Sequence, residues 1–269
     1  MLALVKGCLS CYRNDMAIKY DDIIIIDTET TGIFDEDRII QLAFIVIDAN
    51  TMSVKNRYSD LCSTSVPIKG EATKVHKKTN DMIKNLPRLK KTETYKMLVK
   101  YNKPQNVFVF HNASFDLFML AKEKFMTKAE LIDTLTCAYH MFPKSESFKL
   151  QNLMEAQCSV NKRQKHDALS DCVMCQTLLE KMTETKSLTK LIQYTKQPVI
   201  GFGKHKGTHF ATLATKNTDY LEWLRNNYDT MDTPTMLLIK CLIKPDELTS
   251  TERKGIEYLK FGHFIKSAE

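Results

Sequence analysis

The stretch that decides the fold is Ile23-Ile-Ile-Ile26, followed directly by Asp27-Thr-Glu29-Thr-Thr-Gly32. Four consecutive β-branched residues bounded by polar residues are typical of a strand that is buried on both faces of a sheet. Residues i and i+2 of a strand point to the same face, so Asp27 and Glu29 are expected to project side by side where the strand ends. Two carboxylates held close together repel each other unless a cation lies between them. Taken alone, the stretch is equally compatible with an Asp helix cap and an ordinary exposed Glu.

Two further segments place polar residues where buried elements begin or end. His111-Asn-Ala-Ser-Phe-Asp116 follows the apolar run Val107–Phe110, and ligands of open α/β sheets bind beyond the carboxyl ends of strands. Asp116 is therefore a third carboxylate of interest, with capping of the next helix as the alternative. His166-Asp-Ala-Leu-Ser-Asp171 fits a loop histidine followed by a carboxylate in the first turns of a helix. A lone histidine is more often structural than catalytic, but this one accompanies a fourth carboxylate.

The order of the remaining elements predicts an α/β domain with a mixed sheet, because three strands are followed by alternating helices and one more strand. A strand or helix begins at Ile132 and stops before Pro143. We expect strands at Ile23–Ile26, Ile39–Ile47, Met52–Leu61 and Val107–Phe110, and helices at Glu71–Leu86, Glu93–Tyr101, Asp116–Phe125, Leu150–Gln157 and Asp167–Met182.

The three polar segments together resemble a known family. In order, they read D-x-E-T-T-G, H-N-x-x-F-D and H-D-A-L-x-D, which is the signature of the DEDDh 3′–5′ exonucleases, a group that includes the proofreading subunit of bacterial DNA polymerase III and ribonuclease T. The resemblance runs from about Ile23 to Met182. Residues 71–79 are similar to the family's E-A-x-x-x-H-G-I-T, with Lys77 and Lys78 in place of Gly and Ile, and 132–135 are similar to its D-T-L element. The resemblance implies a ribonuclease H-like fold, a mixed five-stranded sheet flanked by helices.

The resemblance also implies a two-metal phosphodiester hydrolase. Hydrolysis needs a hydroxide near neutral pH and a stabilised leaving oxygen, and two divalent cations about 3.5–4 Å apart supply both. By resemblance, Asp27, Glu29, Asp116 and Asp171 are catalytic residues that hold the metals, and their hard oxygens suit Mg²⁺ or Mn²⁺. His166 is the implied general base, which an ordinary histidine pKa of about 6.5 permits.

The substrate-binding residues follow from the same resemblance. The backbone amides of Thr30 and Thr31 are implied to contact the 3′-hydroxyl of the terminal nucleotide. Phe115 matches an aromatic residue that stacks beside the terminal base, a sequence-tolerant contact, although a core position is the alternative. Asn112 is implied to bond to sugar or phosphate, and His76 lies where the family often places a nucleotide contact.

The charge of the chain permits a polyanionic partner without requiring one. There are 39 basic and 32 acidic residues, a net charge of +7, and the excess is spread along the chain. One basic stretch lies beside the expected site, and it is compatible with a solvated helical face or with phosphate contacts to the incoming strand. It comprises Lys69, Lys74, Lys77, Lys78, Lys84, Arg88, Lys90, Lys91, Lys96, Lys100 and Lys103.

We expect three segments: a leader over residues 1–19, an exonuclease domain over 20–185 and a small C-terminal α+β module over 195–269, with the polar Thr183–Thr189 as linker. No apolar run approaches the roughly 20 residues that span a bilayer, and the apolar start is too short for a signal peptide. We therefore expect a cytoplasmic, intracellular protein with reduced thiols and no membrane contact. Two C-x-x-C pairs, Cys8/Cys11 and Cys172/Cys175, leave a zinc site as a minor alternative.

The C-terminal segment contains Gly201-Phe-Gly-Lys-His-Lys-Gly207, which resembles the F-G-K-x-K-G pattern of a short domain sometimes attached to exonuclease domains. Lys204, His205 and Lys206 are compatible with phosphate contacts or with an ordinary hairpin turn. Trp223, the one tryptophan of the chain, is expected in the core of this segment.

The sequence predicts a metal-dependent 3′–5′ exonuclease that hydrolyses single-stranded or frayed DNA 3′ ends to nucleoside 5′-monophosphates. The expected setting is DNA replication, proofreading or repair, with a polymerase as partner, because the chain carries no polymerase domain of its own. One alternative is a 3′–5′ exoribonuclease in RNA processing, which would differ in its contacts to the 2′-hydroxyl. The other is a non-catalytic nucleic-acid-binding module, which the presence of all five catalytic side chains disfavours.

Overall fold

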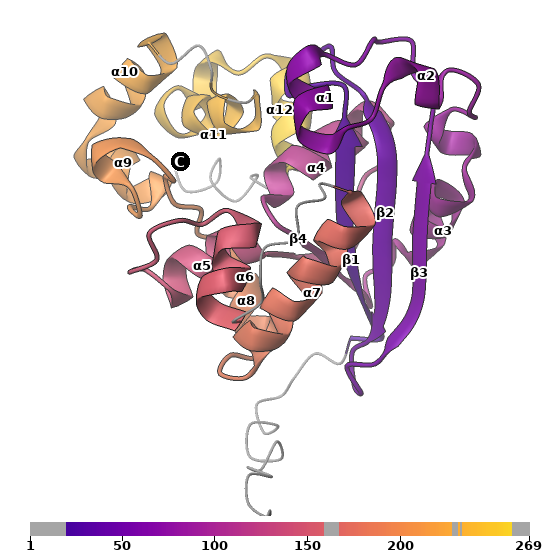
Figure 1. Ribbon diagram of the computed structural model, residues 1–269. Helices are drawn as coiled ribbons and strands as arrows, with labels where there is room; N and C mark the ends of the chain where they lie inside the picture. Colours follow the sequence, from indigo (N-terminus) through magenta and orange to yellow (C-terminus); the bar gives the residue numbers. More distant parts are fainter. Residues whose placement is uncertain (1–19, 159–166, 228–230, 232, 260–269) are drawn as a thin grey trace, which may run out of the picture.

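The centre of the protein is a mixed five-stranded sheet, in which β1 occupies the middle position of the order β3-β2-β1-β4-β5 (Figure 1). β1 is antiparallel to β2 and parallel to β4. β3 pairs with β2 antiparallel, and β5 pairs with β4 parallel. The predicted mixed sheet of the ribonuclease H-like fold is thus confirmed. The strands are β1 (Asp22–Thr30), β2 (Ile39–Asp48), β3 (Val54–Leu61), β4 (Val107–Phe110) and β5 (Glu130–Asp133).

The computed structural model describes residues 20–158, 167–227, 231 and 233–259. Helices cover both faces of the sheet, and in Figure 1 α7 crosses in front of β1 and β2. The helices of this part of the chain are α1 (Gly70–His76), α2 (Asn80–Ile83), η1 (Leu89–Lys91), α3 (Glu93–Tyr101), α4 (Ala113–Lys122), α5 (Thr134–Met141), α6 (Leu150–Cys158), α7 (Ala168–Thr183) and α8 (Leu188–Thr195).

The isoleucine run of β1 supplies both hydrophobic cores. Ile23 and Ile25 belong to the cluster under α5, α6, α7 and α8, whereas Ile24 and Ile26 belong to the cluster under α3 and α4. All four side chains are fully buried, which is why the run lacks the polar alternation of a half-exposed strand. The period of two continues beyond the run, so Asp27 lies on the face that α7 covers.

Several element boundaries differ from the prediction for local reasons. The third strand begins at Val54 because Met52 lies in a turn with a positive φ of 58°. The helix predicted over Glu71–Leu86 is interrupted, since Lys77 adopts the left-handed conformation (φ 61°) and ends α1. α4 begins at Ala113, three residues early, so Asp116 lies in its first turn. The segment from Ile132 is the end of β5 followed by α5, which Asp133 caps through the Leu135 amide.

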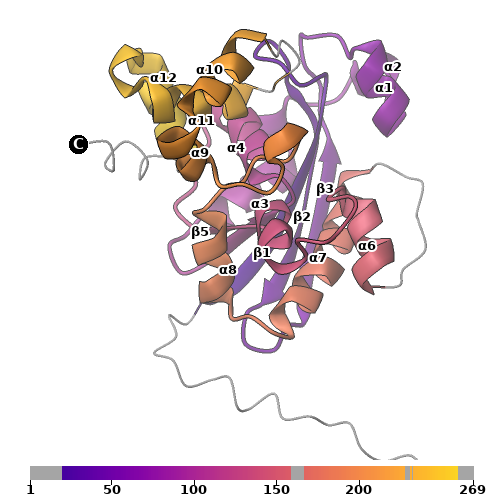
Figure 2. The same ribbon diagram turned by 90° about the vertical axis from the view of Figure 1, so that its left-hand side faces the viewer.

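The C-terminal helices gather around a hydrophobic cluster of their own, apart from α1 and α2 (Figure 2). They pack against the part of the chain that carries the sheet through contacts of α11 and α12 with α4. Among the described residues, the expected β content of this segment is limited to an isolated bridge between Val199 and His209. The elements are η2 (Gly203–His205), α9 (Phe210–Lys216), α10 (Thr218–Asn227), α11 (Thr233–Ile243), η3 (Pro245–Glu247) and α12 (Ser250–Tyr258).

The predicted linker Thr183–Thr189 connects two helices that pack on the same core. α8, which begins at Leu188, buries Leu191 and Ile192 in the cluster beneath α7, and the Thr195 hydroxyl accepts a hydrogen bond from the Asp133 amide (2.8 Å). The sheet-bound part of the chain therefore continues to Thr195. No helix of the described residues is long and apolar enough to cross a membrane.

A buried aspartate fixes the loop that follows β1. The fully buried Asp37 carboxylate accepts hydrogen bonds from the Thr31 hydroxyl (2.8 Å), the Phe34 amide (2.8 Å) and the Lys69 ammonium group (2.9 Å). Burial raises the pKa of Asp37, but these donors outweigh it and hold the pKa below its ordinary value. A Cβ at Gly32 would lie 2.4 Å from Asp37 Oδ2, so the loop requires glycine there.

We expect Gly32→Ala to lower the free energy of unfolding by about 1–3 kcal/mol, because the new methyl group must displace a carboxylate held by three donors. Urea denaturation measures this loss. Gly70→Ala is the matched control, since a Cβ at Gly70 meets nothing within 4 Å, and its effect should stay within about 0.5 kcal/mol. Equal stability of Gly32→Ala and the wild type would contradict this role of Asp37.

Candidate active site

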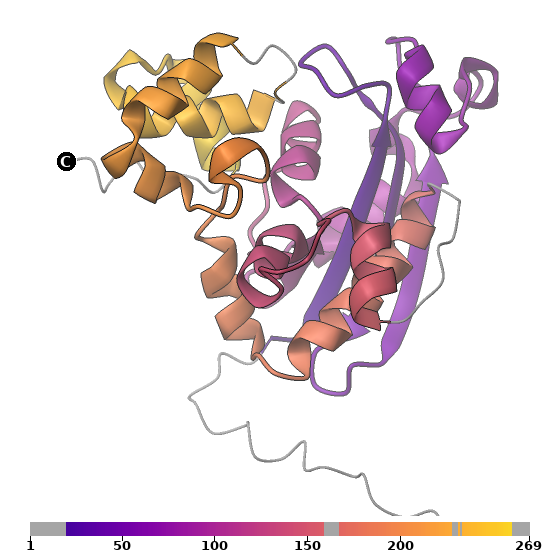
Figure 3. The ribbon, with the colours of Figure 1, turned by 60° about the vertical axis from the view of Figure 1, so that its left-hand side comes forward.

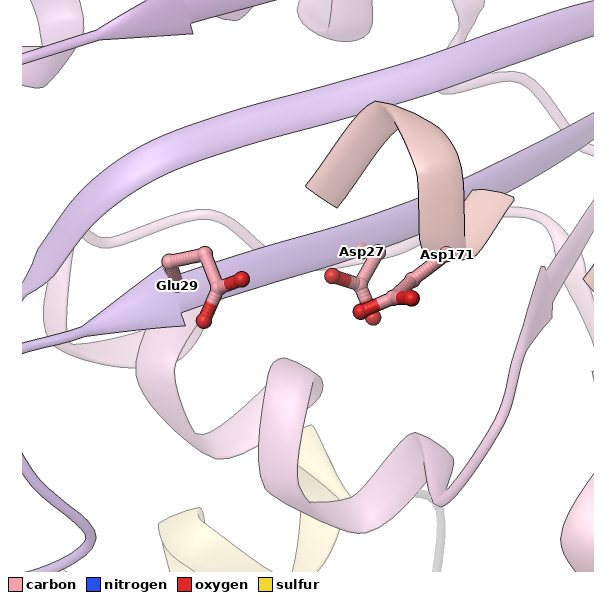
Figure 4. Close-up of side chains that lie close together, drawn as sticks. All are labelled: Asp27, Glu29 and Asp171. Carbon is pink, nitrogen blue, oxygen red and sulfur yellow. The ribbon is translucent and has the colours of Figure 1, made fainter. Parts of the chain in front are cut away.

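Three carboxylates converge at the end of β1. Asp27 and Glu29 of β1 and Asp171 of α7 each offer an oxygen atom, and these atoms lie within 4.8 Å of one another (Figure 4). The two β1 residues share a face because they are two positions apart, and Asp171 joins them because α7 packs on β1. The structure thus brings together three of the four predicted metal ligands.

The fourth predicted ligand, Asp116, is buried beside this group in the first turn of α4. Its Oδ1 accepts a hydrogen bond of 2.6 Å from the Thr28 hydroxyl. Because Thr28 lies between Asp27 and Glu29 in β1, the bond ties Asp116 to the strand that carries the other carboxylates. Sequence reasoning did not find this contact, although a threonine between two candidate ligands was its visible signal.

The crowding of carboxylates raises their pKa values. Burial raises the pKa of Asp27 well above its ordinary value, and the charges of Asp116, Asp171 and Glu29 raise it further. Burial also raises the pKa values of Glu29, Asp116 and Asp171 to about 7. The charge of Asp167 raises the pKa of Asp171 further. In each case removal from water and like charge disfavour the ionised form.

The same residues fit a divalent cation. Glu29 Oε1 is buried and has no hydrogen-bond partner among the described residues, which is costly for a carboxylate oxygen unless a cation completes it. The donor set consists of hard carboxylate oxygens, the type that Mg²⁺ and Mn²⁺ prefer. A cation here would also lower the raised pKa values, since it favours the ionised carboxylates.

Lys78 is a site residue that sequence reasoning did not assign. Its ammonium nitrogen lies 4.0 Å from Glu29 Oε1 and 3.7 Å from Asp167 Oδ1, and its side chain is 8% exposed. The charge of Lys78 lowers the pKa values of Glu29 and Asp171, partly opposing burial. The available signal was the departure from the family pattern, which has isoleucine where this chain has Lys78.

The third motif is anchored to β2 by an amide side chain. Gln41 Nε2 donates to Asp167 Oδ1 (2.9 Å) and to the Ser59 hydroxyl (3.0 Å). The Asp171 amide in turn donates to the carbonyl of Asp167 (3.0 Å) at the start of α7. His166, the predicted general base, lies outside the described residues.

Two predicted substrate contacts are engaged within the protein. The Thr31 amide, which is predicted to contact the 3′-hydroxyl of the terminal nucleotide, donates to the Arg38 carbonyl (2.9 Å). His76 is buried, and its Nδ1 accepts from the Lys78 amide (3.0 Å), which leaves Nε2 to donate to the Thr30 carbonyl (3.2 Å). His76 therefore supports the backbone of Thr30.

The second motif is held by neighbouring elements. His111 Nε2 contacts the Phe148 carbonyl (3.0 Å) and its Nδ1 contacts the Thr134 hydroxyl (2.9 Å). Asn112 adopts a left-handed conformation (φ 80°), and its amide donates to Asp133 Oδ1 (2.9 Å). Phe115 is half-buried at the edge of the α4 cluster, which leaves part of its ring accessible.

The two cysteines of the Cys172/Cys175 pair are buried in the core beneath α7. Burial raises the pKa of each thiol above its ordinary value, which disfavours the thiolate that zinc requires. Cys8 and Cys11 lie outside the described residues. Cys172 and Cys175 of α7 therefore pack in the hydrophobic core.

We expect the metal-free protein to lose stability as the pH rises from about 5 to about 8. The raised carboxyl pKa values mean that the folded state binds more protons than the unfolded state above their ordinary values of 3.8 and 4.5. The resulting stabilisation is complete below those values and is lost as the pH passes about 7. Melting temperatures in EDTA measure the fall, which Asp171→Asn should reduce. If the melting temperature fell equally steeply with pH in Asp171→Asn, in wild type and in the surface control Asp246→Asn, the raised pKa of Asp171 would be contradicted.

We expect Lys78→Met to bind Mn²⁺ roughly tenfold more tightly than wild type at about pH 8, equivalent to about 1.4 kcal/mol. The ammonium group and a metal ion are attracted to the same carboxylates, so removing the fixed charge leaves more negative potential for the metal. Isothermal titration calorimetry measures the affinity. Lys78→Arg keeps the charge and should resemble wild type; equal affinities of Lys78→Met and Lys78→Arg would show that Lys78 does not act on the metal site.

Several known proteins are similar to this chain in sequence and fold. The chain is 27% identical over 226 residues to exodeoxyribonuclease 10 of Escherichia coli (strain K12), covering 80% of this chain and 96% of that protein. It is 31% identical over 164 residues to the DNA polymerase III subunit epsilon of Treponema pallidum, covering 58% of this chain and 74% of that protein. The solved structure of exonuclease X in complex with 5′ overhanging duplex DNA has a TM-score of 0.53 at 24% identity, covering 64% of this chain and 98% of that one.

A second solved structure, E. coli exonuclease I in complex with a dA16 oligonucleotide, has a TM-score of 0.54 at 16% identity and covers 78% of this chain and 60% of that one. Both structural likenesses establish the fold. Residues 24–179 match the family model described as Exonuclease, and this range contains Asp27, Glu29, Asp116 and Asp171. The chain therefore belongs to the exonuclease family and is a nuclease with a ribonuclease H-like fold.

Proposed function

We propose that the chain is a metal-dependent 3′–5′ exonuclease that removes nucleoside 5′-monophosphates from single-stranded or frayed DNA 3′ ends. The observation that carries the proposal is the convergence of Asp27, Glu29 and Asp171 within 4.8 Å, with a buried Glu29 oxygen that lacks a hydrogen-bond partner among the described residues. Buried carboxylates that repel one another are stabilised when a divalent cation binds between them. The membership of the exonuclease family supports phosphodiester hydrolysis as the chemistry.

Asp27, Glu29 and Asp171 would hold Mg²⁺ or Mn²⁺, and Asp116 would support a second ion. Two divalent ions bound at such a site supply an activated water molecule and stabilise charge on the leaving oxygen. Thr28 orients Asp116 through its hydroxyl. Lys78 supplies a fixed positive charge beside Glu29 and Asp167.

His166 is the proposed general base that takes a proton from the attacking water. The support is its place in the sequence directly before Asp167, whose side chain lies 3.7 Å from Lys78 beside the carboxylate group. The rate should then rise as the imidazole loses its proton, near its ordinary pKa of about 6.5. A rate that stays flat between about pH 5 and 8 with chemistry limiting would exclude this role.

Binding of the terminal nucleotide is proposed for Thr30, Asn112 and Phe115. Phe115 keeps part of its ring accessible at the start of α4, where a base can stack on it. Asn112 follows directly from β4, at a strand end of the kind that binds ligands in open sheets. Thr30 ends β1 next to Glu29, and His76 holds its carbonyl in place.

The names of the relatives support DNA as the substrate. One relative is named an exodeoxyribonuclease and another a subunit of DNA polymerase III. We accordingly propose an intracellular role in replication or repair, with a polymerase as a partner in proofreading. The assay described next distinguishes DNA from RNA as the substrate.

We expect a ladder of products shortened from the 3′ end when 5′-labelled single-stranded DNA is incubated with the protein and Mg²⁺ or Mn²⁺, and none in EDTA. Asp27→Asn should reduce hydrolysis to background while retaining DNA binding in EDTA, because it removes the central metal ligand without removing the substrate surface. Asp246→Asn, an exposed aspartate in η3, is the matched control and should cleave like wild type.

A matched RNA oligonucleotide is the second arm of the assay. A ladder on RNA alone would move the proposal to RNA processing with the same chemistry. Full activity of Asp27→Asn would contradict the metal site, and no ladder on either substrate with folded wild-type protein would contradict exonuclease activity.

A further inference from the structure

The C-terminal helices carry an open hollow that the exonuclease site does not use. The hollow has a volume of about 910 Å³ and lies between η2 and the junction of α9 with α10. Figure 3 shows these helices beside the sheet, with the turn of η2 between them and the rest of the molecule. Its lining includes Lys204, Lys216, Asp219, Tyr220 and Trp223.

Trp223 is exposed where a core position was expected. Its side chain is 52% exposed, because Leu221 and Leu224 occupy the buried face of α10. The indole ring stacks on the ring of Tyr220, with centroids 6.1 Å apart and planes inclined by 18°. A paired, outward-facing tryptophan offers a rigid aromatic surface at low entropic cost.

Two lysines lie at the hollow that contains this aromatic pair. The Lys204 ammonium nitrogen lies 5.3 Å from the centroid of the Tyr220 ring, and the His205 ring meets the same tyrosine edge-on at 4.4 Å. Lys216 also lines the hollow, and Asp219 is the carboxylate among the lining residues. Stacking surfaces interleaved with lysines are the means by which proteins bind single-stranded nucleic acid without sequence preference.

Gly203 allows the turn to approach Tyr220 closely. Gly203 adopts a positive φ of 65°, and a Cβ built there would lie 2.7 Å from the Tyr220 hydroxyl oxygen. A side chain at this position would therefore push the turn away from the tyrosine. The glycine spacing of the motif thus places Lys204 over the aromatic ring.

The turn is also fixed relative to the active site. The Lys206 ammonium group donates to the Glu146 carbonyl (3.3 Å) and lies 5.3 Å from the centroid of the Phe148 ring. The Phe148 carbonyl contacts His111 of the second motif (3.0 Å). These contacts link the turn that follows Lys204 to His111, directly after β4.

We propose that the hollow formed by Lys204, Lys216, Tyr220 and Trp223 binds the substrate's single strand several nucleotides on the 5′ side of the cleaved nucleotide. The inference rests on the proposed exonuclease function and adds a second contact for the same strand. Trp223 stacks on a base, and the lysines contact phosphates. Such a site favours long strands over short ones, because only a long strand reaches both surfaces at once.

The single tryptophan makes the test direct. Unlabelled dT16 is titrated into wild-type protein in EDTA, where hydrolysis is blocked, while tryptophan fluorescence is recorded. We expect saturable quenching that weakens with salt. Fluorescence anisotropy with labelled dT16 then compares variants: Trp223→Ala should lose about 5- to 100-fold in affinity, and Trp223→Phe should recover part of it.

Lys216→Ala should weaken dT16 binding, whereas Lys254→Ala, an exposed lysine of α12, should bind like wild type. In hydrolysis assays with metal, Trp223→Ala should raise KM for dT16 more than for a thymidine dinucleotide. Unquenched tryptophan together with unchanged affinity of Trp223→Ala would overturn the inference even if wild-type protein degrades dT16. Failure of wild-type protein to degrade any oligonucleotide would instead count against the proposed function.

Discussion

The repulsion among carboxylates at the end of β1 is the constraint on which the rest of the structure depends. Asp27, Glu29 and Asp171 are held within 4.8 Å of one another, an arrangement that opposes their simultaneous ionisation. Elements on both sides of the sheet hold it in place: four buried isoleucines anchor β1 in two hydrophobic cores, and α7 brings its carboxylate onto the strand. The fold thus concentrates negative charge that a divalent cation is suited to neutralise.

The surrounding loops hold the backbone of this site through buried polar contacts. Asp37 organises the turn after β1, His76 braces the Thr30 carbonyl, and Gln41 joins β2 to Asp167. Each buried polar atom in these contacts has a partner, which avoids the cost of an unsatisfied group. Glu29 Oε1 differs in lacking a hydrogen-bond partner among the described residues, and the Lys78 ammonium nitrogen lies 4.0 Å from it.

Local periodicity predicted four of the five strands and the pairing of Asp27 with Glu29, and the resemblance to the exonucleases implied the five-stranded sheet and the remaining carboxylate ligands. The period of two in β1 placed Asp27 beside Glu29, and the apolar run of β4 marked the strand end before Asp116. Tertiary contacts decided the remainder. Lys78 reaches the site because left-handed Lys77 ends α1 and turns the chain, and periodicity carries no signal for such a turn.

The C-terminal helices show the same limit. Trp223 was expected inside on composition, but the spacing of Leu221 and Leu224 gives the buried face of α10 to the leucines. The helical spacing of Leu221 and Leu224 was the signal from which the exposure of Trp223 could have been predicted. In the structure, Trp223 is an exposed residue whose ring stacks on that of Tyr220.

The central claim is that the carboxylate group at the end of β1 is a divalent metal site. Anomalous diffraction from crystals of the wild-type protein grown with Mn²⁺ tests it most directly. The account predicts an anomalous peak coordinated by Asp27, Glu29 and Asp171. Crystals with intact protein and Mn²⁺ bound only elsewhere, or with no peak at these carboxylates at saturating Mn²⁺, would contradict it.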